Sequence, residues 1–549
     1  MTMKKLILYT TILILAVSCK KLLVEDVRTQ ISNQYLNTPA GLEDGVKACY
    51  VALRSWYGTQ SGGWLTVFGT DEYTNGNADP TFNNYTANLN PANGVFNATS
   101  GVWAQLYKGI NTCNAVIAAA ANVSGMDSTL KNTRLAEAYF LRAHYYFLLV
   151  QTFGPLELTL TPTNSASSVA TRTPVKEVYS SIISDLNFAI AHLPKTPSDI
   201  GRVSLAAAQH GLAKVYLTRA GSTAAESSDY ARAEALAEEV ITTSDAKLLP
   251  DFKDIFAQGA GEVNPEVIFS CQYSLNPLAG GGNNAHLDFD CGYDGQPGMM
   301  RDLANGRPYA HFKPTAYMLG LYDQKYDSRF EGTFKTVWYC NKPGTYTING
   351  KSVQMHLGDT AFITTTREVS QSERNAVSYK IFAPSDYTTT VWPMNSKFQD
   401  SLRTAINDAN GTKDLIIYRL GETYLIAAEA AFMAGHPDKA LVYVNTLRRR
   451  AAIQGATPEI TAANQAAMEV RQSDLSLSFF LDERARELSG EYMRWFDLVR
   501  TKTLLSRVKL YNPAAAVLIK DYHVLRPIPQ KQIDATQGTS TAFPQNTGY

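Results

Sequence analysis

Residues 131–150 read KNTRLAEAYFLRAHYYFLLV and follow, after a short polar break, residues 101–122, which read GVWAQLYKGINTCNAVIAAAAN. In both stretches apolar residues recur at three- and four-residue spacing, which is typical of helices with one buried face. The pair therefore predicts a helical hairpin. This hairpin decides the fold class, because its plan recurs further along the chain.

The plan appears twice more. Residues 204–221 (SLAAAQHGLAKVYLTRAG) precede residues 230–244 (YARAEALAEEVITTS), and residues 415–435 (LIIYRLGETYLIAAEAAFMAG) precede residues 437–451 (PDKALVYVNTLRRRA). Two-helix units of this kind cannot bury their apolar faces alone and therefore stack on one another, as tetratricopeptide repeats do.

Small residues support this interpretation. Ala207, Gly211, Ala428 and Ala440 stand where helices would cross closely, and Gly435-His436-Pro437 supplies a helix stop and restart. We therefore predict a mainly α fold, with a tetratricopeptide-like helical-repeat frame at about residues 101–250 and 413–505.

Two stretches interrupt the helical pattern. Residues 57–100 and 251–412 are rich in Gly, Asn, Asp, Thr and aromatic residues, and they hold short β-like runs such as EVIFSCQY and WLTVF. Irregular segments of this length in a compact protein usually carry a function. We therefore expect these two inserts to form the ligand-binding surface.

The composition argues against several classes of function. Fifty basic and fifty acidic residues give no net charge, so the chain as a whole has no electrostatic footprint for nucleic acid. Besides Cys19, five cysteines remain, with no CxxC pair and no Cys/His group at zinc spacing. We expect no disulfide scaffold, no metal, no cofactor and no nucleic-acid partner.

The first residues predict an export signal that ends in a lipid anchor. Two lysines precede an apolar run at residues 6–17, which is shorter than the about 20 residues that a membrane-spanning helix needs. The sequence LAVSC, residues 15–19, looks like a bacterial lipobox. We expect residues 1–18 to be a signal peptide, Cys19 to be acylated and residues 19–30 to form a tether. The alternative is an ordinary secreted protein whose cysteine lies near the cleavage site.

Several phrases together resemble the SusD/RagB family of outer-membrane lipoproteins of Bacteroidetes. Besides the lipobox they are RLAEAYFLRAHYYFLLVQTFGPLEL (134–158), YRLGETYLIAAEAAFMAG (418–435), LDERARELSGEYMRWFDLVR (481–500) and LRPIPQKQI (525–533). The resemblance runs from the anchor almost to the C-terminus.

The resemblance implies a single α-rich domain, residues 31–549, with four tetratricopeptide-like units, held on the cell surface at the outer membrane. It also implies that the protein binds a glycan, or in some members a peptide, and forms the lid of a SusC-like TonB-dependent transporter.

Carboxylates recur at Glu483, Glu487 and Glu491, a spacing that would place them on one helix face. Arginines are interleaved with them, and no helix with a Glu-x-x-His motif is present to complete a metal site. We interpret the phrase as a structural ion-pair network.

No catalytic motif is evident. The sequence has no G-x-S-x-G, no H-E-x-x-H and no Walker loop. Asp71-Glu72 in GTDEYTNGN comes nearest to a glycosidase pair, but adjacent residues on an extended chain point to opposite faces and would not flank a bond. We expect a binding protein without catalytic residues.

Sugar binding requires exposed aromatic planes beside polar groups that hydrogen-bond hydroxyls. The first insert offers Trp64, Tyr73 and Tyr85 beside Asp71, Asn75 and Asn77, and the second offers Tyr293, Tyr309, Trp338 and Trp392 near Asp294, Arg307, Asn341 and Asn395. We predict that the ligand-binding residues are Trp64, Tyr73, Asp71, Tyr293 and Trp338.

Three functions remain open. Glycan capture predicts exposed rings in the inserts, whereas a peptide-binding lid predicts a deep enclosed pocket with unpaired backbone groups. A tetratricopeptide-type assembly subunit without a nutrient ligand predicts neither. Three or more fully buried insert aromatics would count heavily against glycan capture.

Overall fold

The computed structural model describes residues 33–549, apart from residues 98–99, 164, 166, 275, 277–281 and 537–542. The predicted signal peptide, Cys19 and the tether lie outside the described residues. Among the helices of the described part, none combines the length and apolar character needed to cross a bilayer.

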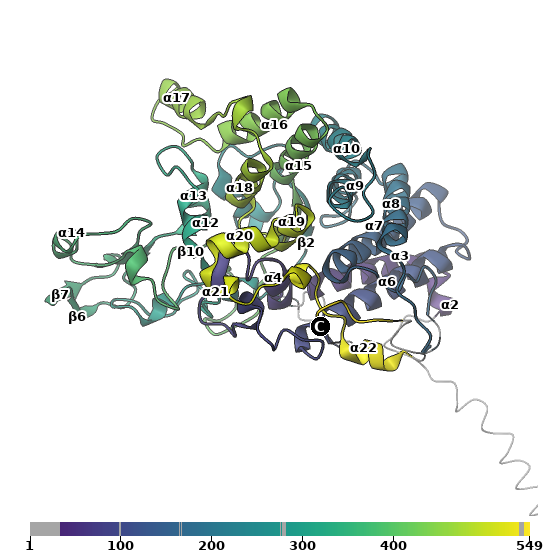
Figure 1. Cartoon of the computed structure of the whole chain (residues 1–549), viewed down its shortest axis with the longest axis horizontal. Coiled ribbons are helices and arrows are strands. Elements are labelled where there is room, and N and C mark those ends of the chain that lie inside the picture. Colours follow the sequence, from purple (N-terminus) through teal and green to yellow (C-terminus); the bar gives the residue numbers. More distant parts are fainter. Residues whose placement is uncertain are drawn as a thin grey trace, which may run out of the picture.

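The frame is a stack of helices in which each helix packs on the next. They are α6 (Val102–Ala120), α7 (Ser128–Phe153), α8 (Val175–His192), α9 (Leu205–Arg219), α10 (Asp229–Thr243), α15 (Leu420–Met433) and α16 (Pro437–Arg450). Figure 1 shows them as a curved array on one side of the molecule. This arrangement confirms the predicted mainly α fold with a tetratricopeptide-like frame.

The ends of the frame helices follow the signals in the sequence. Gly435 takes a left-handed φ of 87° after α15, and Pro437 begins α16, which confirms the predicted stop and restart. The side chain of Asp127 accepts a hydrogen bond from the Leu130 N–H and so caps α7, and Ser204 caps α9 in the same way.

Shorter helices surround the frame. They are α2 (Asn33–Leu36), α3 (Pro39–Tyr50), α4 (Gln60–Thr66), α5 (Thr81–Asn84), α11 (Ala285–Phe289), α12 (Ala316–Gly320), α13 (Arg329–Thr333), α14 (Gln371–Asn375), α17 (Pro458–Met468), α18 (Leu477–Leu488), α19 (Arg494–Arg500), α20 (Leu504–Tyr511), α21 (Pro513–Ala516) and α22 (Gln530–Ala535).

The strands are short and form small sheets. They are β1 (Tyr73–Asn75), β2 (Val267–Cys271), β3 (Phe312–Pro314), β4 (Phe334–Lys335), β5 (Val337–Tyr339), β6 (Gly344–Ile348), β7 (Lys351–Met355), β8 (Thr360–Thr364), β9 (Lys380–Phe382), β10 (Met394–Asn395) and β11 (Leu415–Arg419). β1 pairs with β3, β2 with β11, β4 with β10 and β6 with β7, while β8 lies between β5 and β9. The β1–β3 pair joins the first insert to the second.

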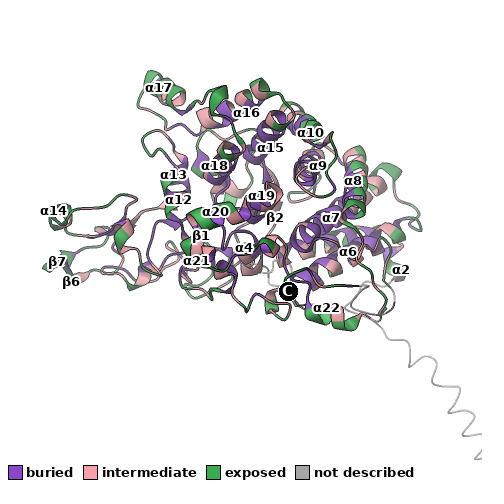
Figure 2. Ribbon diagram, in the orientation of Figure 1, coloured by how far each residue is buried: buried purple, intermediate pink, exposed green. Residues whose placement is uncertain are grey.

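Part of the second insert projects from the body. This arm, residues 337–382, comprises β5–β9 and α14, and Figure 1 shows β6, β7 and α14 far from the frame. Figure 2 shows its tip as exposed and the facing sides of the frame helices as buried. The base of the arm has an apolar core of its own, in which the rings of Trp338 and Phe362 stack with centroids 4.4 Å apart.

Of the two β-like runs predicted in the inserts, one is correct. EVIFSCQY contains β2, but WLTVF begins inside α4, so the strand prediction there is wrong. A five-residue apolar run does not distinguish a strand from a helical turn. In α4 the Thr66 hydroxyl donates to the Gly62 carbonyl at 2.6 Å, which fits helical spacing.

An ion-pair junction ties the frame to the second insert. Its members are Glu266, Arg329, Lys397, Arg419, Arg448, Arg450, Glu483, Glu487 and Glu491. Glu487 contacts Arg329 at 3.1 Å and Arg419 at 2.8 Å, and Arg419 also contacts Glu491 at 2.8 Å. All of these carboxylates are buried, which confirms the structural interpretation of the glutamate series.

The predicted single helix face for Glu483, Glu487 and Glu491 is wrong. Helix α18 ends at Leu488, and the chain turns through Gly490, whose φ is 77°. A Cβ at Gly490 would lie 2.9 Å from the Asn395 amide nitrogen, so a close approach to the insert requires glycine there. Glu491 reaches the junction from this turn instead of from a third helical turn.

We expect Arg419→Met to lower the free energy of unfolding by about 3–5 kcal/mol, because it leaves Glu487 and Glu491 buried without their shared partner. Chemical denaturation followed by circular dichroism measures this loss. Arg449→Met is the matched control, because Arg449 pairs with Glu469 at the surface and should cost less than about 1 kcal/mol. Equal losses for the two variants would contradict the role of the junction.

The junction also predicts acid sensitivity. Burial alone would raise the pKa of Glu487, but the guanidinium groups of Arg450, Arg419 and Arg329 outweigh it and lower that pKa from 4.5 to about 2. The stabilisation is therefore complete above pH 4.5 and is lost as the pH falls towards 2. Thermal unfolding between pH 6 and pH 2.5 should show a falling midpoint, with a shallower fall for Glu487→Gln. Parallel curves for the two proteins would exclude Glu487 as the source.

Candidate functional site

Three of the predicted ligand-binding rings are fully buried. Tyr73, Tyr293 and Trp338 each have no exposed surface. The Tyr73 hydroxyl lies 2.8 Å from the Ser489 hydroxyl and accepts a hydrogen bond from the Asn395 amide at 2.7 Å. These rings cannot stack on a ligand, so their prediction as an exposed platform is wrong.

The reason is that the second insert folds around its own apolar core. Tyr293, Trp338 and Trp392 belong to the cluster at the base of the arm, and Tyr73 belongs to the main core. Because more than three insert aromatics are fully buried, they count heavily against glycan capture through the rings that the sequence suggested. A binding surface has to be built from other side chains.

Asp71 is also buried, and its prediction as a ligand-binding residue is wrong. Its carboxylate pairs with Arg494 and Arg507, each at 2.7 Å. Burial raises the pKa of the neighbouring Glu72 to about 8, although Arg494 lies 3.3 Å away. With 1 % of Glu72 exposed, this carboxyl group has no access to a substrate.

Trp64, the remaining predicted residue, is half-buried and begins a continuous row of side chains. Its ring lies 6.0 Å from that of His311, and His311 lies 5.4 Å from Tyr309. The guanidinium of Arg307 follows at 5.3 Å from the Tyr309 ring. We call these four side chains, Trp64, His311, Tyr309 and Arg307, the ring row. All four are partly exposed, and they connect α4 of the first insert with the segment before β3 in the second.

A buried carboxylate orients the row. Asp288, at the end of α11, has no exposed surface, and its Oδ1 lies 2.7 Å from His311 Nδ1. Gln60, one helical turn before Trp64, donates to the same oxygen at 2.7 Å. The carboxylate favours the proton on Nδ1 of His311, which leaves Nε2 as an acceptor. Nε2 makes no hydrogen bond with any described residue, so it can accept one from a ligand hydroxyl.

Sequence reasoning named Trp64, Tyr309 and Arg307 as insert residues but missed His311, Asp288 and Gln60. One signal could have found His311. In RPYAHFK, residues 307–313, a ring or a cation occupies every second position, and the structure leaves these positions half-exposed while Ala310 and Phe312 are buried. Alternation of this kind marks a segment with one buried face.

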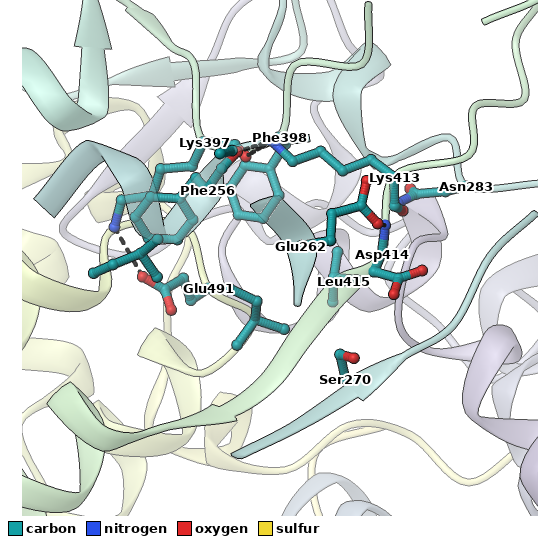
Figure 3. Close-up of a pocket in the computed structure, with 13 residues that line it drawn as sticks. Phe256, Glu262, Ser270, Asn283, Lys397, Phe398, Lys413, Asp414, Leu415 and Glu491 are labelled. Carbon is teal, nitrogen blue, oxygen red and sulfur yellow. Dashed lines mark hydrogen bonds and ion pairs between the residues drawn. The ribbon is translucent and has the colours of Figure 1, made fainter. Parts of the chain in front are cut away.

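The cavity in Figure 3 lies at the ion-pair junction and is too small for a sugar. Its volume is about 30 Å³, close to the space of one water molecule. Lys397 donates to Glu491 at 2.8 Å, and Lys413 donates to the carbonyl groups of Phe256 and Lys397. Burial lowers the pKa of Lys413 to about 8 and raises that of Asp414 to about 7, because it withdraws both groups from water and disfavours their charged forms.

Larger hollows lie on the frame. One of about 590 Å³ lies between α19 and α20 on one side and the ends of α7 and α9 on the other. Apolar side chains line it, among them Val150, Val499, Leu505 and Leu525. Two others, of about 360 and 370 Å³, flank residues 199–202 beside β2. None of them contains a row of rings like that at Trp64.

The described part of the chain has no group of side chains arranged for metal binding or for thiol chemistry. No group of three or more His, Cys, Asp or Glu side chains is placed there to hold a metal ion. The cysteines at positions 49, 113, 271, 291 and 340 are free and buried.

Two family models match the chain. The one described as the SusD family covers residues 265–549, and the one described as starch-binding associating with outer membrane covers residues 65–217. The SusD-like protein P25 of Formosa agariphila is 24% identical over 580 residues, and the alignment covers 100% of both chains.

Solved structures share the fold. A laminarin binding SusD-like protein superposes with a TM-score of 0.68 at 23% identity and covers 93% of this chain and 100% of its own. Surface glycan-binding protein A from Bacteroides thetaiotaomicron, in complex with laminarihexaose, gives a TM-score of 0.64 at 21% identity and covers 93% and 99%. Because the first family model spans just over half of the chain, this protein belongs to the SusD family.

Proposed function

We propose that this protein is a lipid-anchored protein of the outer-membrane surface that binds a glycan, catalyses no reaction and hands the glycan to a SusC-like TonB-dependent transporter. The ring row carries the proposal. It presents partly exposed rings, a guanidinium and a free histidine nitrogen on one surface, and these are the groups that hold the apolar faces and hydroxyl edges of sugars.

Polar groups of the first insert lie beside the row. The backbone of Asn77 donates to the Ala310 carbonyl at 2.7 Å, and that of Gly76 donates to the His311 carbonyl at 2.9 Å. These bonds place the exposed side chain of Asn77 next to the segment that carries the rings. The surface therefore combines stacking and hydrogen-bonding groups from both inserts.

The comparisons support a glycan as the ligand. Two structures with this fold carry names that state binding to laminarin or to surface glycans, and the family description for residues 65–217 mentions both starch binding and the outer membrane. Lipidation at Cys19 rests on the LAVSC sequence, and transfer to a transporter rests on the family resemblance.

Binding of the body, residues 20–549, to a panel of polysaccharides and peptides tests the proposal. We expect one class of polysaccharide to bind, and we expect Trp64→Ala and Tyr309→Ala each to weaken binding about tenfold or more, equivalent to about 1.4 kcal/mol. Affinity electrophoresis and calorimetry measure the change. Tyr339→Ala is the matched control, because Tyr339 is 59% exposed and lies outside the row.

The outcomes separate the alternatives. Binding of peptides alone would replace glycan capture with a peptide-binding lid. Absence of any ligand, together with retained binding to the transporter, would favour an assembly subunit. Glycan binding that survives both ring substitutions would place the site elsewhere on the protein.

The anchor has its own test. We expect Cys19→Ser in the full-length chain to abolish incorporation of labelled palmitate and to release the protein from the membrane fraction, because the LAVSC sequence then has no thiol to be acylated. Lys20→Ala keeps the thiol and is the control. Palmitate incorporation by the Cys19→Ser chain would show that the anchor is at another residue.

A further inference from the structure

Arg307, at one end of the ring row, has no acidic partner among the residues that the structure describes. Its guanidinium lies over the Tyr309 ring and donates to the Asn407 carbonyl at 2.6 Å. It forms no ion pair with any carboxylate of the described residues. Two arginines buried elsewhere in the chain do have such partners, since Arg142 pairs with Asp185 and Arg494 pairs with Asp71.

Lys313 repeats this feature six residues further along the same segment. Its ammonium group donates to the Thr388 carbonyl at 3.1 Å and lies 6.0 Å from the Tyr387 ring centroid. It likewise has no carboxylate partner among the described residues. Partial burial lowers the pKa of Lys313, because it withdraws the ammonium group from water.

Three carboxylates near the row, two buried and one exposed, form no ion pair with Arg307 or Lys313. Asp288 is buried against His311 and Gln60, and Asp290 is buried and accepts a hydrogen bond from the backbone N–H of Arg307 at 3.1 Å. Asp79 is exposed, with Oδ1 bound to the Thr81 N–H at 2.8 Å. Arg301, which also reaches Asn407, is paired with Asp294. Arg307 and Lys313 are therefore the unneutralised charges on the ring-bearing segment.

We infer that the ligand of the ring row is an anionic glycan, whose carboxylate or sulfate groups pair with Arg307 and Lys313 while its sugar faces lie against Trp64 and Tyr309. The inference rests on the proposed function and adds the charge of the ligand to it. A guanidinium fixed over a ring presents donors that suit carboxylate and sulfate oxygens. An anion would also supply the counterion that the half-buried Lys313 lacks.

The chain as a whole does not attract polyanions, because its fifty basic and fifty acidic residues balance. Selectivity for an acidic glycan would therefore come from this segment. Two matched pairs of polymers test it, each with one backbone in a neutral and an anionic form: hydroxyethylcellulose with carboxymethylcellulose, and dextran with dextran sulfate. Alginate, which carries carboxylates, and a sulfated galactan then show which of the two anionic groups the protein prefers.

We expect affinity electrophoresis of the body, residues 20–549, to show retardation by anionic polymers at least tenfold stronger than by their neutral partners. Arg307→Gln and Lys313→Gln should each remove most of this preference, and Arg307→Lys should retain part of it. Lys351→Gln is the matched control, because Lys351 also donates to a backbone carbonyl, has no ion pair in the described part and lies on the arm. Thermal unfolding confirms that each variant is folded.

Three results would overturn the inference. Equal binding of neutral and anionic partners, with Trp64→Ala still weakening both, would leave glycan capture in place and remove the charge preference. If the preference for anionic polymers fell as much in Lys351→Gln as in the Arg307 and Lys313 variants, it would reflect general attraction between lysines and polyanions and not a specific site. Binding of no polysaccharide, neutral or anionic, would defeat the proposed function and the inference together.

Discussion

The position of the inserts depends on the buried ion pairs between the frame and the second insert. Glu487 on α18 lies between Arg329 from the insert and Arg419, which precedes α15. Charges withdrawn from water are stable only when every partner is present. This requirement fixes where the insert meets the frame. His311 and Asp288, which orients the ring row, belong to this insert, so the position of the row depends on a junction buried beneath it.

The frame could be predicted from the sequence because its signals are local. Apolar spacing defines each helix, and Gly435 and Pro437 define a boundary that the structure reproduces. The break after α18 could not be predicted in this way. Helical spacing continues through Glu491, and the turn at Gly490 is required by contacts with Asn395, which is distant in sequence.

The site was harder to predict because aromatic content does not reveal exposure. Trp338 and Tyr293 occur in irregular, polar stretches, yet they form the core at the base of the arm. Trp64 was predicted as a ligand-binding residue and is a partly exposed ring in the structure, but its partners were not found. His311 becomes meaningful only when the fold brings Asp288 and Gln60 to it. Its alternation with Tyr309 was the one local signal.

The ring row consists of side chains at the surface of a short segment, whereas the frame and the ion-pair junction lie beneath it. Substitutions at Arg307, Tyr309 or Lys313 alter what the surface presents without disturbing the buried pairs that hold the insert. The proposed ligand preference and the stability of the fold therefore depend on different side chains. A few point mutations on this segment can therefore change the charge and the ring pattern of the surface while the buried scaffold stays intact.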